Sequence, residues 1–437
     1  MELVKEADAV VADQNKAKLD FTITTKGRIK SNSPRNVSLI LENDPYLKDA
    51  IKFNEFTENI DVVRPIDIDL SGWGLPSIHI KKGIYTDAVG EDLALYMEVN
   101  PDYGNTIFTP TLIRQAAGNT ARDHRYNPVV DYFNECRKKW DEKARIVDFF
   151  PEFLGVEKNE ANTLIAKLFF LGIVGKGLDP DVKFDYVIDL VGGQGVGKTT
   201  LLRKMAPGGF YTDSISSFTE KDDFAEMRTA VIVNDDEMNA SNKATFEETK
   251  KFITMPEFSY RPPYGRDNLT FKKKFVICRT TNEIKHLKDK SGDRRFLSLM
   301  CDRSKQVHHP VVDLDQDLVD QLWGEAIWLY ETTEEPFALT PDQNELLEES
   351  REKFLYTSAL EDNLRDLLDN EFANEDFITN DEMWSALSVT QGAQPVTEQQ
   401  KRKVRYYMEH LDWEVGATRK ITQDDGSRKT FRGFKRK

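Results

Sequence analysis

A glycine-rich segment constrains the fold of this chain more than any other feature of its sequence. It follows a short apolar run at residues 186–190 and reads Gly192, Gly193, Gln194, Gly195, Val196, Gly197, Lys198 and Thr199. Thr200 opens a helical pattern directly after it. Glycine, lysine and threonine at this spacing are typical of a loop that joins a strand to a helix and binds phosphate.

The residue types in this segment suit the phosphates of ATP. Glycines let the backbone curl so that successive N–H groups and the helix N-terminus face the phosphate oxygens. Lys198 would neutralise the β and γ phosphates, and Thr199 would hold Mg²⁺. The alternative, an accidental glycine turn, arises in a chain of this length with a chance on the order of a per cent. We therefore predict that the chain binds ATP and Mg²⁺ and hydrolyses ATP.

An apolar run that ends in acids supplies the second half of such a site. Residues 229–233 are followed by Asn234, Asp235, Asp236 and Glu237. We assign the Mg²⁺ shell to Asp236 and the attacking water to Glu237, with Asp235 as the rival for the metal. An acidic strand end alone is more often a solvated turn, but the preceding glycine loop favours the site.

Two further segments could complete the site. The apolar run at residues 274–278 leads to Asn282, which we predict to sense the γ-phosphate; a capping or turn role is the alternative. Arg294 and Arg295 could act on the ATP of a neighbouring subunit, where an arginine stabilises the transferring phosphoryl group. A surface ion pair is the alternative, and it would explain one arginine as easily as two.

Composition limits where the protein works and what it binds. The chain of 437 residues carries a formal net charge of −15, which argues against uniform coating of nucleic acid. Its three cysteines lack metal-site spacing, and neither a signal peptide nor a membrane span is recognisable. We predict a cytoplasmic protein with no membrane partner.

The order of apolar patterns predicts four regions. Residues 1–108 form an N-terminal α+β domain of unknown role, and residues 109–175, with a break at Asn127-Pro128, form a helical collar for oligomerisation. In residues 176–347, strands alternate with helices, which predicts an α/β fold with a mainly parallel sheet around the phosphate loop. Residues 348–437 show helices followed by two strands, the pattern of a winged helix.

The chain resembles the virulence-associated protein E family over about residues 110–330. The phosphate loop, the acidic strand end, Tyr-Arg-Pro-Pro-Tyr-Gly at 260–265, Thr-Thr-Asn at 280–282 and Gly-Asp-Arg-Arg-Phe at 292–296 follow the family's order. The family often has a glutamate where this chain has Asn234. The resemblance implies a superfamily 3-like helicase of the AAA+ class from phages and mobile islands. It further implies a ring, expected to be a hexamer, with single-stranded DNA in its pore and Arg294 or Arg295 acting in trans.

On that resemblance, residues 260–274 correspond to a hairpin that projects into the pore. The segment carries a net charge of +4 and two tyrosines that could stack on bases. The DNA contacts predicted here are Tyr260, Arg261, Tyr264, Arg266, Lys272, Lys273 and Lys274. A solvated charged face is the alternative.

The C-terminal residues 401–437 carry twelve basic and five acidic residues, a net charge of +7 in an acidic protein. Such a local excess predicts binding to DNA phosphates. A helix at residues 398–411 could enter the major groove, and a basic wing could hold the backbone. The residues predicted for these contacts are Gln399, Gln400, Arg402, Lys403, Arg428, Lys429 and Arg432. A basic tail without specific binding is the alternative.

These features together predict a replication initiator and helicase of a phage-like mobile element. The C-terminal module would select double-stranded origin DNA, the ring would unwind it, and host replication proteins are possible partners. Three alternatives remain: a regulatory ATPase switch, a transcriptional DNA-binding protein that uses ATP only as a ligand, and a packaging motor.

Overall fold

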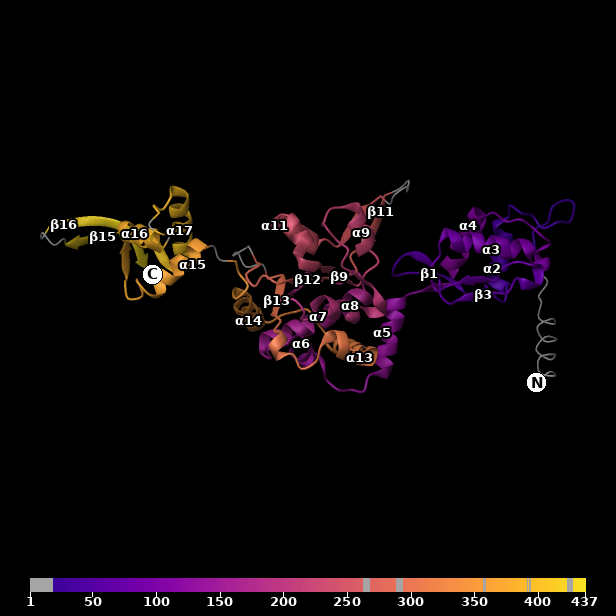
Figure 1. The fold of residues 1–437 in the computed structure, drawn as a ribbon, viewed down its shortest axis with the longest axis horizontal. Helices are drawn as coiled ribbons and strands as arrows, with labels where there is room; N and C mark the ends of the chain where they lie inside the picture. Colours follow the sequence, from indigo (N-terminus) through magenta and orange to yellow (C-terminus); the bar gives the residue numbers. More distant parts are fainter. Residues whose placement is uncertain are drawn as a thin grey trace. The chain divides into compact units, whose positions relative to one another are not determined.

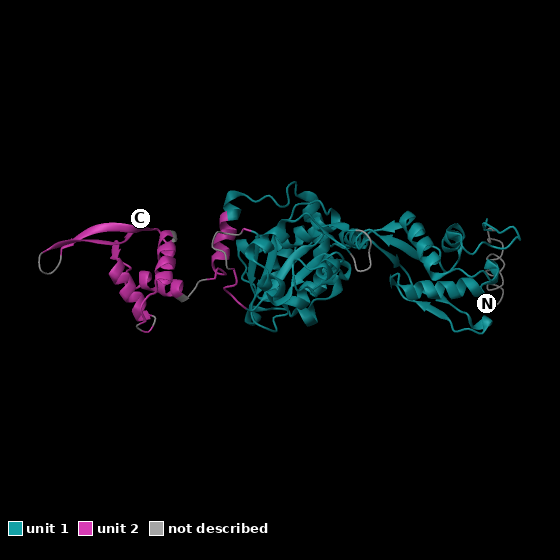
Figure 2. Ribbon diagram, turned by 90° about the horizontal axis from the view of Figure 1, so that it is seen from above, with its two compact units in different colours: residues 1–282, 295–344 teal, residues 283–294, 345–437 magenta. Residues whose placement is uncertain are grey.

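The computed structural model describes residues 19–261, 268–287, 294–356, 359–390, 392, 394–422 and 427–437. The chain divides into two compact units, which we describe separately (Figure 2). One comprises residues 1–282 and 295–344, and the other comprises residues 283–294 and 345–437.

The first part of the larger unit is an α+β domain around a four-stranded sheet of order β5-β2-β1-β6 (Figure 1). Its core contains apolar side chains from all three of the α-helices that the structure describes in this domain. The elements are α2 Pro34–Asn43, β1 Ile51–Asn54, β2 Asn59–Val62, β3 Ile66–Ile68, β4 Ile78–Ile80, β5 Gly83–Ile84, α3 Asp87–Val99, α4 Pro110–Asp123 and β6 Arg125–Tyr126.

Helix α4 belongs to this domain and not to the predicted collar. Ile113, Ala116 and Ala117 of α4 are fully buried in the domain core, and β6 pairs with β1 just after α4 ends. The predicted boundary at residue 108 is therefore wrong, and the domain extends to about residue 126. The helical periodicity of residues 109–123 was correct, but periodicity does not show which core a helix joins.

Four helices pack together in a bundle: α5 Pro128–Lys139, α6 Ile146–Leu154, α7 Glu160–Leu178 and α13 Gln316–Thr332. The predicted break at Asn127-Pro128 is present, because the Asn127 side chain accepts hydrogen bonds from the first turn of α5. Among the described residues, α7 is the helix long and apolar enough to cross a membrane, but 72% of its apolar window is buried. The α7 helix packs against β12 and β13 as a core helix.

The central sheet has five parallel strands in the order β13-β7-β12-β9-β8. Every residue of β7 and β12 is buried, as expected for parallel strands covered on both faces. The predicted α/β fold with a parallel sheet flanked by helices is confirmed. Its elements are β7 Val187–Val191, α8 Lys198–Met205, β8 Tyr211–Thr212, α9 Lys221–Met227, β9 Ile232–Asp235, α10 Asn239–Lys243, α11 Phe246–Thr254, β12 Val276–Thr281 and β13 Phe296–Met300.

Shorter elements complete the described part of the larger unit. An antiparallel hairpin of β10 Glu257–Tyr260 and β11 Leu269–Lys272 lies between α11 and β12. The remaining short helices are η1 Ser71–Trp73, η2 Pro101–Tyr103, η3 Pro207–Gly209, η4 Asp236–Met238, η5 Arg303–Lys305 and α12 Pro310–Asp313.

In the smaller unit, helices pack on a three-stranded antiparallel sheet of order β14-β16-β15. Leu387, Val404 and Met408 are fully buried in its core. Three helices and two final strands follow one another as predicted, but the strand between the first two helices, which pairs with the last strand, was not predicted. Beyond α14 Pro341–Glu352, the elements are α15 Ala359–Asp369, β14 Phe377–Thr379, α16 Asn380–Thr390, α17 Glu398–His410, β15 Trp413–Thr422 and β16 Arg428–Arg436.

Candidate nucleotide-binding site

The predicted phosphate loop joins the end of β7 to the start of α8, where ligands bind in parallel α/β sheets. Its geometry requires glycine at several positions. A Cβ atom on Gly192 would lie 2.3 Å from the carbonyl oxygen of Cys301, and Gly195 and Gly197 have φ of +78° and +91°. A Cβ on Gly193 would meet nothing within 4 Å, so this part of the loop is open to a ligand.

Strand order brings three sequence motifs together. Because β12 lies between β7 and β9, the side chain after β12 can reach both the loop and the acidic strand end. Lys198 Nζ donates to Asn282 Oδ1 at 3.2 Å, and Asn282 Nδ2 lies 3.4 Å from Glu237 Oε1. Asn282 thus links the loop lysine to the acidic residue predicted to orient water.

Lys198 has the surroundings of an anion-binding cation. Its side chain is 7% exposed, and its ammonium also donates to the carbonyl oxygens of Gly192 at 2.6 Å and Gly193 at 3.0 Å. Among the described residues it forms no ion pair, and burial lowers its pKa. A buried ammonium without a carboxylate partner fits a phosphate group, which would supply the missing negative charge.

Asp236 stands beside the loop threonine. Thr199 Oγ1 and Thr280 Oγ1 each donate to Asp236 Oδ1 at 2.7 Å, and Asn234 Nδ2 lies 3.3 Å from the same oxygen. A carboxylate and a threonine hydroxyl are the oxygen ligands that Mg²⁺ takes beside a nucleotide. Thr199 and Asp236 therefore fit a shared Mg²⁺ shell. Thr280 was not predicted from the sequence.

Asp235 is engaged elsewhere, contrary to its predicted rival role. Its side chain is fully buried, and its two oxygens accept hydrogen bonds from the backbone N–H of Ala240 at 2.8 Å and Ser241 at 2.9 Å. These N–H groups belong to α10 and lack helical partners of their own. Asp235 anchors that helix, and the structure leaves Asp236 as the acid beside the loop.

Glu237 is the exposed acid of this strand end. It adopts φ of +52° and ψ of +24°, and Met238 also has a positive φ, a conformation that costs about 1 kcal/mol or more for residues other than glycine. The Glu237 N–H donates to Thr280 Oγ1 at 3.1 Å, which holds the turn. This turn leaves the Glu237 carboxylate open to solvent near Asn282.

Arg295 immediately precedes β13, and Arg294 precedes Arg295. Because β13 runs parallel to β7, the start of β13 and the phosphate loop lie at opposite edges of the sheet. A five-residue strand spans roughly 16 Å. This placement agrees with the predicted action on another subunit's nucleotide, which the structure of one chain leaves as a prediction.

The hairpin residues predicted to bind DNA fall into three groups. Arg261 and Lys272 are exposed, whereas Tyr264 and Arg266 lie outside the described residues. Lys273 and Lys274 are each 5% exposed and donate to the carbonyl oxygens of Ile253 and Phe56.

Tyr260 is 6% exposed and packs on Phe271 with ring centroids 5.4 Å apart. The predicted DNA contacts of Tyr260, Lys273 and Lys274 are therefore wrong for this structure, because buried side chains cannot contact single-stranded DNA. A count of charges along the sequence did not distinguish exposed from buried lysines.

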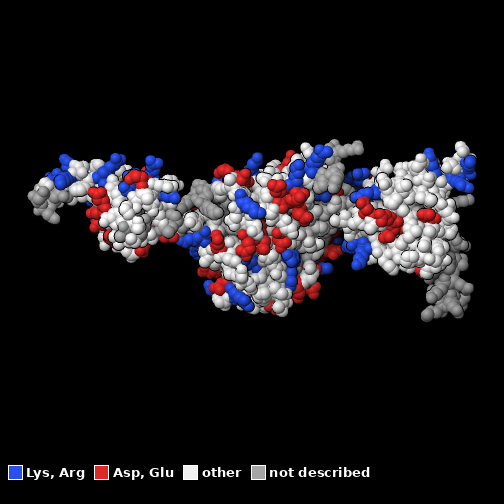
Figure 3. Space-filling model, turned by 45° about the horizontal axis from the view of Figure 1, so that its top comes forward, with Lys and Arg blue, Asp and Glu red and all other residues white. Residues whose placement is uncertain are grey.

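On the C-terminal unit, the predicted DNA-binding residues are mostly exposed. Gln399, Arg402 and Lys403 on α17 are open to solvent, as are Arg428, Lys429 and Arg432 on β16. Lysine and arginine gather along one side of this unit (Figure 3).

Gln400 is the exception among these residues. Its Oε1 accepts from the Thr397 N–H at 2.8 Å in a capping box at the start of α17. Gln400 therefore caps the helix, and its predicted base contact stays a prediction. The pattern Thr397-x-x-Gln400 before a helix was a readable signal of this role.

Three residues beside the loop were missed from the sequence. Gln306 Nε2 donates to Val196 O at 2.8 Å, and His309 Nε2 lies 3.2 Å from Gly195 O. Arg303 Nη1 lies 3.0 Å from the position that a Cβ on Gly195 would occupy. These residues follow β13, more than 100 positions from the loop, and no motif marks them.

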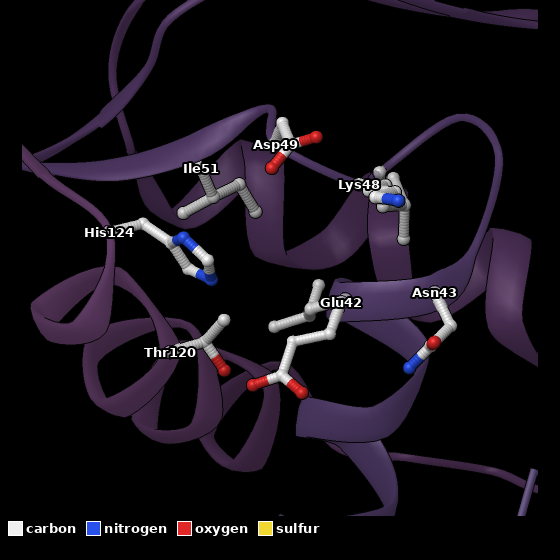
Figure 4. Close-up of a pocket in the computed structure, with 9 residues that line it drawn as sticks. Glu42, Asn43, Lys48, Asp49, Ile51, Thr120 and His124 are labelled. Carbon is white, nitrogen blue, oxygen red and sulfur yellow. The ribbon is translucent and has the colours of Figure 1, made fainter.

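A separate pocket of about 280 Å³ lies in the N-terminal domain. Glu42, Thr120 and His124 surround it (Figure 4). Its lining includes no residue of the phosphate loop or of the acidic strand end. The pocket is therefore distinct from the nucleotide-binding site.

The parallel sheet, the glycine loop and the acidic strand end beside it define a P-loop type α/β core. Within that class, residues 133–356 match the model of the virulence-associated protein E-like domain. The match spans just over half of the chain, and the protein belongs to this family. The resemblance stated from the sequence is confirmed.

No curated protein matches the chain. Among solved structures, the A form apo structure of the NrS-1 C-terminal region, residues 305–718, aligns with a TM-score of 0.45 and 13% identity, covering 92% of this chain and 99% of that chain. Another apo structure of the same region aligns with a TM-score of 0.44 and 14% identity, covering 89% and 96%. Similarity at these values supports no conclusion about function.

Proposed function

We propose that the protein is an ATP-driven DNA helicase and replication initiator of a phage or mobile genetic element. The observation that carries the proposal is the chain of contacts from Lys198 through Asn282 to Glu237, with Thr199 and Asp236 beside it. The Lys198 ammonium can bind phosphate, and the oxygens of Thr199 and Asp236 can bind a metal ion. The exposed carboxylate of Glu237 can orient a water molecule. Membership of the virulence-associated protein E-like family supports the same reading.

Each residue has a defined task in ATP hydrolysis. The loop N–H groups and Lys198 bind and orient the phosphates, which makes the γ-phosphoryl group available for in-line attack. Thr199 and Asp236 would hold Mg²⁺, which neutralises charge on the phosphates when bound. Glu237 orients the attacking water and accepts its proton, while Asn282 fixes the position of Glu237 relative to Lys198.

The DNA-related part of the proposal rests on exposed basic residues. Arg402 and Lys403 on α17 and the basic residues of β16 can contact phosphates of origin DNA. In the larger unit, Arg261 and Lys272 are exposed at the hairpin and can face a single strand in the pore of a ring, for which a hexamer is the expected size. Host replication proteins would then enter the opened origin.

A steady-state ATPase assay tests the site. We expect wild-type protein to hydrolyse ATP in a Mg²⁺-dependent reaction that single-stranded DNA stimulates. Lys198→Ala should lose turnover at least a hundred-fold, because it removes the cation that binds the transferring group. Turnover by Lys198→Ala at the wild-type rate would refute the assignment. An ATPase that DNA does not stimulate would favour the alternative of a regulatory switch.

A further inference from the structure

We propose that Arg303 binds a phosphate group of the nucleotide held by its own chain. The inference rests on the proposed ATP site and adds a second cation to it. Lys198 contacts the loop at Gly192 and Gly193, whereas Arg303 approaches it at Gly195.

Arg303 lies beside the phosphate loop of its own chain. Arg303 opens η5, with two residues between it and β13, and the carboxyl end of β13 lies beside that of β7 in the parallel sheet. Its Nη1 lies 3.0 Å from the place where Gly195 would carry a Cβ, so the guanidinium rests against the middle of the loop. A Cβ at Gly195 would crowd the guanidinium and force it to shift.

Within the part of the chain that the structure describes, the Arg303 guanidinium has no protein partner. Among the described residues, the Arg303 side chain forms no hydrogen bond or ion pair. The nearest acid in sequence, Asp302, accepts hydrogen bonds from the N–H and hydroxyl of Ser304 at 2.9 and 2.7 Å and lies 3.7 Å from Lys305 Nζ. A guanidinium beside a phosphate loop and without a carboxylate is available for phosphate, which it can bind through two N–H groups.

Hydrogen bonds from Gln306 and His309 attach the segment that carries Arg303 to the loop. Gln306 Nε2 bridges Val196 O at 2.8 Å and Phe153 O at 2.6 Å. His309 Nδ1 accepts from the Val311 N–H, which leaves Nε2–H to donate to Gly195 O at 3.2 Å. Arg303 therefore sits on a support that keeps it beside the loop before any nucleotide arrives.

The same placement separates Arg303 from the arginines predicted to act in trans. Arg295 lies just before the start of β13 and Arg303 follows its end. The two arginines therefore lie at opposite ends of the parallel strands. Arg303 is the one on the edge that carries its own chain's loop. We therefore assign Arg303 to the nucleotide of the same subunit.

Calorimetric titration with ATP and with adenosine tests the assignment. Arg303→Gln should weaken ATP binding about ten- to hundred-fold, the loss expected for a charge-assisted hydrogen bond, and leave adenosine binding unchanged. Arg303→Lys should recover part of the affinity, because it keeps the positive charge. Lys305→Gln, a matched change in the same short helix, should bind ATP within two-fold of wild type.

The outcomes separate this inference from the proposed function. If wild type does not bind ATP, the proposed function fails. If wild type binds ATP and Arg303→Gln binds it equally well, the inference about Arg303 is wrong. Weaker binding of ATP and adenosine alike, with a lower melting temperature without ligand and no recovery in Arg303→Lys, would assign Arg303 a structural role and also overturn the inference.

Mixed rings test action in cis. A subunit with Arg303→Gln and one with Glu237→Gln each lack one group of their own site, so no mixture contains both groups in one subunit. We expect turnover of the mixture to equal the mean of the two variants. Recovery above that mean would show that Arg303 acts on a neighbouring subunit, which contradicts the assignment.

Discussion

At the residue scale, Asp235 and Asp236 are adjacent in sequence yet serve different purposes. Asp236 shares hydrogen bonds with Thr199 beside the loop, and Asp235 anchors α10 through two backbone N–H groups. We expect Asp236→Asn to reduce Mg²⁺-dependent ATPase activity at least a hundred-fold with little change in stability, because it removes charge from the proposed metal shell.

Asp235→Asn is the matched control, since an amide has only one acceptor oxygen for the two N–H groups. It should lower the free energy of unfolding by about 1–3 kcal/mol, and the folded variant should keep most of its turnover. ATPase assays and urea unfolding on both variants check this pair. The opposite pattern, with Asp235→Asn inactive and Asp236→Asn active, would reverse the two roles.

Lys273 should make stability depend on pH. Burial, with a smaller effect of nearby Lys176, lowers the pKa of Lys273 from its usual 10.5 to about 7. Between pH 7 and 10.5 the unfolded chain therefore binds a proton that the folded chain has lost, so stability rises with pH. The rise is at most about 1.4 kcal/mol per pH unit for this group.

Lys273→Met removes this titration and keeps an unbranched side chain. The free energy of unfolding of the wild type minus that of Lys273→Met should increase between pH 7 and 9, as measured by urea unfolding of both proteins. Curves that stay parallel across this range would show that Lys273 remains charged in the folded protein.

Site residues could be predicted from the sequence where they lie next to a recognisable motif in the chain. The loop, Asp236 and Asn282 could be predicted because each directly follows an apolar strand. Arg303, Gln306 and His309 reach the loop only through the pairing of β13 with β7, a contact that no local pattern encodes.

At the scale of elements, α17 combines a structural cap with exposed basic residues. Replacing Arg402 and Lys403 together by glutamine should weaken binding to duplex DNA and reduce the slope of log affinity against log salt by about 2, one for each lost phosphate contact. Binding measured by fluorescence anisotropy over a range of salt concentrations checks this value.

Gln400→Ala is the control on the same helix. It should cost about 1 kcal/mol of stability through the lost capping box and leave the salt slope unchanged. A slope that is unaffected by Arg402→Gln and Lys403→Gln would show that α17 does not contact DNA.

The positions of the strands could be predicted from the sequence, whereas the domain to which α4 belongs could not. Buried parallel strands read as continuous apolar runs, so β7, β9 and β12 were placed within three residues. Helix α4 was recognised as a helix but given to the wrong domain. The apolar stripe of a helix is the same whether it faces its own domain or the next.

At the scale of the whole molecule, the arginines before β13 should complete a site on another subunit. In a random equal mixture of Glu237→Gln and Arg295→Ala subunits, about a quarter of the interfaces combine both intact groups if Arg295 acts in trans. We expect turnover of the mixture to exceed the mean of the separate variants, and Arg294→Ala provides the parallel pairing. A mixture that never exceeds the mean for either arginine would count against a shared site.

Strand displacement on a forked DNA duplex tests the central claim most directly. With ATP and Mg²⁺, wild-type protein should separate the strands, and the Lys198→Ala protein, which lacks the loop cation, should not. Unwinding by wild type alone would establish an ATP-driven helicase. DNA-stimulated ATP hydrolysis without strand separation would contradict the account and point to a regulatory switch.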